Sequence, residues 1–152
     1  MIGNFERISP ASFAKKIGIP QGWFVISHRW VPDKKKRRKY HGKWFKLSTA
    51  YGSVYRVIRF SVNLNGAPGS TGEMVIDWSA WLDLFDREEN VDQSIDISIS
   101  PAKWWDFPRL ALSHPDPAVR HAGWFSLASL ALGLISIVLG AWSLYVTYIF
   151  AN

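Results

Sequence analysis

A continuous run of six cations at residues 34–39 is the strongest polar feature of the sequence. Neighbours in a small domain cannot neutralise so many adjacent charges, so the run either stays solvated or meets a polyanion. Further basic and aromatic residues follow within a few positions. We therefore assign a candidate anion-binding site to Lys34, Lys35, Lys36, Arg37, Arg38, Lys39, Lys43 and Lys46, with Tyr40, Trp44 and Tyr51 as candidates for stacking.

Three kinds of partner suit this basic stretch. Anionic lipid headgroups attract such a tract by about 1 kcal/mol per basic residue near the surface. A nucleotide or nucleic acid would use the same charges and stack its bases on the aromatic rings. The third kind is an acidic protein surface, including residues 83–96 of a neighbouring copy. The alternative is a solvated loop without a ligand.

The remaining polar residues give little support for catalysis. The chain has no cysteine, and its four histidines show no metal-ligand spacing. Phosphate-binding glycine loops and nucleophile elbows are also missing from the sequence. The acidic residues between positions 83 and 96 do not follow the calcium-loop pattern and are expected to form a solvated face. We expect a non-enzymatic protein with no catalytic residue, metal or cofactor, and a small membrane-tethered enzyme is the alternative.

A membrane helix is predicted at the C-terminal end, because residues 1–121 carry all 30 charged side chains and residues 122–152 carry none. The segment from Trp124 to Tyr145 would span about 32 Å as a helix, which matches the hydrocarbon core of a bilayer. Aromatic residues flank the segment as in the interfacial belts of membrane proteins. The residues assigned to the membrane interface are Trp104, Trp105, Trp124, Trp142 and Tyr145.

Every serine, threonine and glycine between residues 126 and 147 falls on one stripe of this helix, with spacings that alternate between three and four. This seven-residue repeat is typical of a left-handed helix pair, and small residues let two backbones approach closely. We predict a helix interface with an identical helix or with another membrane protein. Its residues are Ser126, Ser129, Gly133, Ser136, Gly140, Ser143 and Thr147.

The charges beside the predicted span indicate its orientation. Lys103, Arg109 and Arg120 precede the span, and no basic residue follows it. Positive residues favour the cytoplasmic side, and residues 1–7 do not resemble a secretory signal. The sequence therefore predicts a single-pass, tail-anchored protein whose N-terminal domain is cytoplasmic.

Residues 1–100 are predicted to form a soluble, mainly β domain, a small antiparallel sheet or open barrel of about five strands with one or two short helices. Runs rich in β-branched and aromatic residues indicate strands at residues 22–30, 43–50, 54–64, 73–78 and 91–100. Ser9, Pro10 and Gly18 are placed to begin and end a short helix. Trp78, Trp81, Leu82 and Phe85 follow helical spacing and favour a second helix.

Residues 101–121 join the β domain to the predicted span at residues 122–152. Their aromatic and basic residues indicate a segment at the membrane surface, and the alternative is a connector whose tryptophans belong to the soluble core. Together these features predict a membrane sensor or effector that oligomerises or docks through its helix stripe and binds an anionic partner. An accessory subunit of a larger membrane complex is the alternative within the same class.

Overall fold

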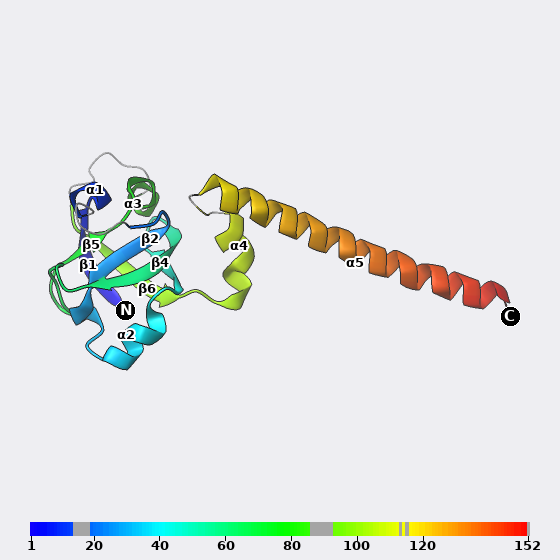
Figure 1. Cartoon of the computed structure of the whole chain (residues 1–152), viewed down its shortest axis with the longest axis horizontal. Coiled ribbons are helices and arrows are strands. Elements are labelled where there is room, and N and C mark those ends of the chain that lie inside the picture. The colour runs from blue at the N-terminus through cyan, green and yellow to red at the C-terminus, as the bar shows by residue number, and fades with distance from the viewer. Residues whose placement is uncertain (14–18, 86–92, 113, 115, 152) are drawn as a thin grey trace. The chain divides into compact units, whose positions relative to one another are not determined.

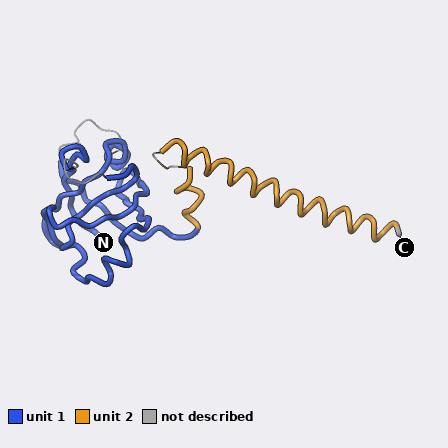
Figure 2. Tube along the Cα trace, in the orientation of Figure 1, with its two compact units in different colours: residues 1–104 blue, residues 105–152 orange. Residues whose placement is uncertain are grey.

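The computed structural model describes residues 1–13, 19–85, 93–112, 114 and 116–151. These residues form two compact units, Met1–Trp104 and Trp105–Asn152, which Figure 2 colours separately. The secondary structure confirms the predicted class, a mainly β domain with short helices and one long C-terminal helix. The predicted acidic segment falls largely on residues 86–92, and the end of the predicted first helix on residues 14–18. Both lie outside the described residues.

Six strands of the described residues close into a barrel with the order β1-β5-β2-β4-β3-β6 (Figure 1). Their bounds are Ile2–Ile8 (β1), Trp23–Ser27 (β2), Trp44–Ser48 (β3), Ser53–Ser61 (β4), Gly72–Val75 (β5) and Ile95–Pro101 (β6). The pairings of β1 with β5 and of β2 with β4 are parallel, and the others are antiparallel. The sheet closes because β1, a strand that the sequence pattern did not indicate, pairs with both β5 and β6.

Side chains fill the barrel because alternate residues of each strand point inward. Phe5, Phe24, Phe45, Ile58 and Ile97 are among those that are fully or almost fully buried there. The short 3₁₀ helix His28–Trp30 follows β2 and brings Trp30 against the interior, with its ring 4.7 Å from that of Phe5. A Cβ atom at Gly72 would lie 2.9 Å from this indole, so glycine is needed for the close approach.

Helix α3 (Trp78–Leu84) covers the opposite end of the barrel. It buries Ala80, Trp81 and Leu84 in the main core, in agreement with the helical spacing of its apolar residues. Helix α1 (Pro10–Phe13) belongs to a second apolar cluster, in which Phe13, Ile19 and others pack on Val25 and Val75. Because Val25 and Val75 alternate with interior residues of β2 and β5, this cluster covers the outer wall.

The chain leaves the barrel at one end, and helix α3 covers the other. Strands β2 and β4 are parallel and finish together, β3 runs antiparallel to β4 and so begins toward the same end, and β6 finishes against the start of β3. Here the chain also leaves the barrel, since the Ala102 amide donates to the Trp44 carbonyl oxygen at 3.0 Å. We call this the exit end. The far end is the one that α3 covers.

The second unit contains helices α4 (Phe107–Leu112) and α5 (Pro117–Ala151). The carboxylate of Asp116 accepts from the Ala118 amide at 2.9 Å and so caps the start of α5. From Pro117 to Phe150 this helix is long and apolar enough to cross a membrane, with a mean hydropathy of 2.1 and none of its most apolar window buried. It is compatible with a single membrane-spanning segment.

Candidate anion-binding surface

The run of six cations forms helix α2 (Lys34–Tyr40) rather than a loop. Asp33 provides the N-cap, because its Oδ1 accepts a hydrogen bond from the Lys35 amide at 2.8 Å. Lysine and arginine are also good helix formers, since their unbranched side chains lose little rotamer freedom in a helix. The cap and the composition therefore explain a short helix that simple charge counting treats as a loop.

Arg37 and Tyr40 hold α2 against the barrel. One guanidinium nitrogen of Arg37, Nη1, donates to the Val31 carbonyl at 2.8 Å and to the Pro32 carbonyl at 2.9 Å. The half-buried Tyr40 ring meets Phe45 edge-on with 5.5 Å between centroids. Arg37 therefore has a structural task that its five charged neighbours do not share, and the Tyr40 ring is already packed on the core.

The other cations of α2 point into solvent. Residues four apart lie on the same helix face, so Lys34 with Arg38, and Lys35 with Lys39, form two parallel rows away from Arg37 and Tyr40. All four side chains are exposed, and within the described part of the chain they make no ion pair. We call Lys34, Lys35, Arg38 and Lys39 the basic face. Lys36 is exposed at its flank.

The remaining predicted residues are spread over both ends of the barrel. Lys43 is exposed beside α2, after a turn in which Gly42 has a φ of 75°. Trp44 and Lys46 are half-buried and alternate with the interior residues of β3, so they face outward. Tyr51 is 64% exposed but lies in the turn from β3 to β4, at the far end. The fold therefore groups Lys43 with the basic face and separates Tyr51 from it.

The basic face lies at the exit end. Tyr40, the last residue of α2, is followed by a short turn, and Trp44 begins β3. The Trp44 carbonyl is the group that receives the Ala102 amide where the chain leaves the barrel. Nine basic residues and one acidic residue lie between Arg29 and Lys46. Positive charge is therefore concentrated where the chain continues toward α5.

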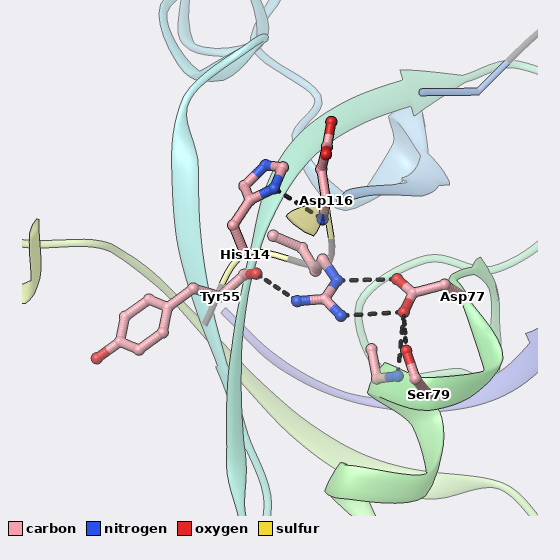
Figure 3. A network of polar contacts seen from close by, with 7 residues as sticks. Tyr55, Asp77, Ser79, His114 and Asp116 are labelled. Carbon is pink, nitrogen blue, oxygen red and sulfur yellow. Dashed lines mark hydrogen bonds and ion pairs between the residues drawn. The ribbon is translucent and has the colours of Figure 1, made fainter. Parts of the chain in front are cut away.

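A buried ion pair lies at the far end of the barrel (Figure 3). Arg56 points inward from β4, and its guanidinium donates to both carboxylate oxygens of Asp77, at 2.8 and 2.9 Å, and to the Tyr55 carbonyl at 2.8 Å. Asp77 also accepts from the Ser79 hydroxyl at 2.7 Å and from the Ala80 amide at 3.1 Å. Every polar atom of this carboxylate is occupied by the chain itself, so we assign it a structural role.

The same surroundings shift the pKa values of two groups at this end, Asp77 and Arg7. Burial alone would raise the pKa of Asp77, but the hydrogen bonds and charge of Arg56, with the bonds from Ser79 and Ala80, hold the pKa below its ordinary value. Arg7, at the end of β1, has its guanidinium 4.8 Å above the Trp78 ring. Burial lowers the pKa of Arg7, and the charge of Asp77 opposes this effect. Both groups remain charged at neutral pH.

A half-open pocket of about 210 Å³ lies on the outer wall of the barrel. Phe13, Ile19 and Val25 give it an apolar surface, and Arg59, Ser61 and Asn63 line it with polar groups. It is small for a ligand site, since such sites usually measure about 300–1,000 Å³. We therefore attach the anion-binding assignment to the basic face and not to this pocket.

The predicted interface stripe lies on α5, where its glycines are open: a Cβ atom at Gly133 or Gly140 would meet nothing within 4 Å. Three of its hydroxyls, those of Ser126, Ser136 and Thr147, donate to carbonyls one turn earlier at 2.9 Å. These hydroxyls are therefore satisfied within the helix. The aromatic residues predicted for the membrane interface, Trp104, Trp105, Trp124, Trp142 and Tyr145, are all more than half exposed.

Sequence reasoning did not identify Arg37 as an anchor, nor Arg56 and Asp77 as partners. A basic residue on the apolar face of β4 was the available signal for Arg56, but its partner is 21 residues away and cannot be chosen from one sequence. No protein-family model matches this sequence, and no curated protein matches it either. The assignment of the site therefore rests on its geometry and charge.

Proposed function

We propose that this chain is a non-enzymatic, single-pass membrane protein whose β-barrel binds anionic lipid headgroups through the basic face of α2. The observation that carries the proposal is the position of this face at the exit end, beside the point where the chain leaves for α5. Charges attract a membrane only within about 8–10 Å at physiological salt. A basic surface beside the tether can reach that range more easily than one at the far end.

The energetics of α2 support an anionic partner. Like charges four residues apart destabilise a helix by about 0.2–0.5 kcal/mol per pair, and the basic face contains two such pairs. The fold nevertheless holds these charges in place through the Asp33 cap and the Arg37 hydrogen bonds. Phosphate groups would remove the repulsion and supply an attraction of about 1 kcal/mol for each basic residue near the surface.

The proposal includes an orientation, in which the barrel lies on the cytoplasmic side of the membrane. Anionic lipids are concentrated in the cytoplasmic leaflet, and the basic residues Lys103, Arg109 and Arg120 all precede the span. Both arguments support a cytoplasmic barrel. A protease that enters the cytoplasmic side should remove a tag at residue 1. Protection of the tag there, with cleavage from the other side, would contradict this orientation.

Helix α5 is proposed to dock on another helix through its small-residue stripe. Since three of its hydroxyls are satisfied within the helix, close backbone approach at Gly133 and Gly140 is the main contribution of the stripe. A homo-oligomer in mild detergent would support a self-assembling sensor or effector. A single copy that purifies with larger membrane proteins would support an accessory subunit.

Lipid binding can be tested with labels, because the chain contains no cysteine. A fluorophore at His41→Cys reports on the exit end, and one at Ala50→Cys reports on the far end; both positions are exposed. In nanodiscs that contain phosphatidylserine, a headgroup-bound quencher should reach the first label and not the second. High salt or zwitterionic lipid should remove the difference.

The decisive variant replaces Lys34, Lys35, Arg38 and Lys39 with glutamine and keeps Arg37, so that α2 stays anchored. At about 1 kcal/mol per charge, the preference for anionic nanodiscs should fall by up to about a thousandfold. Lys46→Gln, on the outer wall of β3, is the matched control and should change it less than tenfold. If the label at His41→Cys is quenched equally in anionic and zwitterionic nanodiscs, headgroup binding is refuted. An oligonucleotide that shields the first label at physiological salt would instead indicate nucleic acid as the partner.

A further inference from the structure

Helix α4 packs against the first turns of α5, most closely where Ala111 meets Gly123. A Cβ atom at Gly123 would lie 2.8 Å from the Ala111 Cβ and 3.1 Å from its carbonyl oxygen, so only glycine permits this approach. Leu110, beside Ala111, is 8% exposed. Figure 1 shows α4 running across the direction of α5. The second unit therefore contains a short helix held crosswise on a long one.

Two hydrogen bonds involve the described residues just before α5. His114 Nδ1 accepts from the Asp116 amide at 3.0 Å (Figure 3), and the Asp116 carboxylate caps the first turn of α5. Pro117 occupies the first helical position, where its missing amide hydrogen costs nothing. The approach of α4 to α5 is thus specified at Gly123, and the start of α5 by Asp116 and Pro117.

The level of this crossing can be read from the length of α5. The helix has 35 residues and is about 52 Å long, whereas a hydrocarbon core is about 30 Å thick. The segment from Trp124 to Tyr145 fills such a core, at about 32 Å. Residues 117–123 then project about 10 Å into the headgroup region, and they include the exposed Arg120 and His121. Gly123, where α4 crosses, lies at the boundary.

We infer that α4 is an interfacial helix, which lies in the membrane plane at the level of Gly123 and inserts Phe107, together with Trp105 shortly before it, among phospholipid headgroups. If α5 follows the membrane normal, a helix that crosses it runs along the surface. Trp105 is 56% exposed and Phe107 is 66% exposed, directly before and at the start of α4. Aromatic rings favour this depth, and the exposed Arg109 of α4 adds positive charge there.

This inference rests on the membrane span of the proposed function but not on the basic face of α2. Its test therefore uses zwitterionic vesicles, in which α2 is not expected to bind. A fluorophore is placed at Pro108→Cys in α4, with reference labels at Ala50→Cys in the barrel and at Leu134→Cys in mid-span. Lipids that carry a nitroxide near the headgroup or deep in the acyl chain act as quenchers. The label in α4 should be quenched at least twofold more by the shallow lipid, and the mid-span label more by the deep one.

Gly123→Leu should separate α4 from α5 and lower the shallow quenching of the α4 label by at least half, whereas Ala128→Leu, at an exposed site one turn further on, should leave it unchanged. An α4 label that is quenched no more than the barrel label would overturn the inference, as would quenching that Gly123→Leu does not alter. If Gly123→Leu also reduces the deep quenching of the mid-span label, it has disturbed the insertion of α5, and Phe107→Ser is used instead. It should raise the exposure of α4 to an aqueous quencher at least twofold while the span stays inserted.

Discussion

In the ion pair at the far end of the barrel, we expect replacement of one partner to destabilise the fold more than replacement of the other. The Arg56 side chain is 5% exposed and lies inside the barrel, whereas the Asp77 side chain is 29% exposed. Arginine cannot shed its proton in a protein, so loss of the carboxylate leaves a buried charge without a counterion. Asp77 retains bonds from Ser79 and Ala80 when the arginine is lost. The aspartate change should therefore be the more damaging one.

Asp77→Asn isolates the charge, because asparagine is also a good N-cap and can still accept from the Ala80 amide. Breaking a buried pair from one side costs about 3–5 kcal/mol, and we expect Asp77→Asn to lower the free energy of unfolding by about 3 kcal/mol at neutral pH. Arg56→Met should cost about 1–2 kcal/mol, since it fills the same space and leaves a partly hydrated, still hydrogen-bonded carboxylate. The double variant should cost less than the sum of the two.

Urea unfolding of the full chain in mild detergent, followed by near-ultraviolet circular dichroism, measures these differences. The pH dependence provides a second check. Because the folded pKa of Asp77 lies below its unfolded value of about 3.9, the stabilisation is complete above that value and is lost as the pH falls through the folded pKa. Wild type should thus approach Asp77→Asn in acid. Equal costs for the two single variants, or strict additivity, would refute the reasoning.

Three further changes test other contacts. Gly72→Val brings a side chain onto the packed Trp30 indole and should destabilise the barrel by about 1–3 kcal/mol in the same urea assay; an unchanged midpoint would contradict the close approach. Arg37→Ala should weaken α2 by about 1–3 kcal/mol and speed its amide hydrogen exchange, whereas Arg38→Ala should not; equal exchange would argue against the anchor. Gly140→Leu should lower crosslinking between membrane helices, and a similar loss from Leu134→Phe on another face would show that the stripe is not the interface.

Much of the fold follows from local patterns in the sequence. Ile95, Ile97 and Ile99 alternate with polar residues and face the interior of β6, as the pattern predicts. Strand β1 could not be recognised because its inward positions include Gly3 and Arg7, while Ile2 is 78% exposed. Its hydrophobic pattern is therefore nearly inverted. Gly3 leaves space for the Trp30 ring, and Arg7 lies over Trp78 at the far end of the barrel. Both contacts are made with residues far away in the sequence.

The basic run was visible in the sequence, but its structure was not. Six adjacent cations indicated an anion-binding surface, and their spacing alone does not distinguish the anchored Arg37 from its exposed neighbours. That difference depends on the backbone carbonyls of Val31 and Pro32, which point at one guanidinium only in the folded turn. The grouping of the basic face with the exit of the chain similarly depends on the register of β3 with β6.

Closure of the barrel has a consequence for the single-pass membrane protein that we propose. Confinement to two dimensions raises the frequency of encounters between copies, and a sheet with unpaired edges would then offer templates for intermolecular strand addition. Here β1 pairs on one side with β5 and on the other with β6, so the six described strands have no open edge. Crowding on the bilayer is thereby prevented from turning into aggregation through the barrel backbone. The proposed contacts between copies would then involve side-chain surfaces and α5.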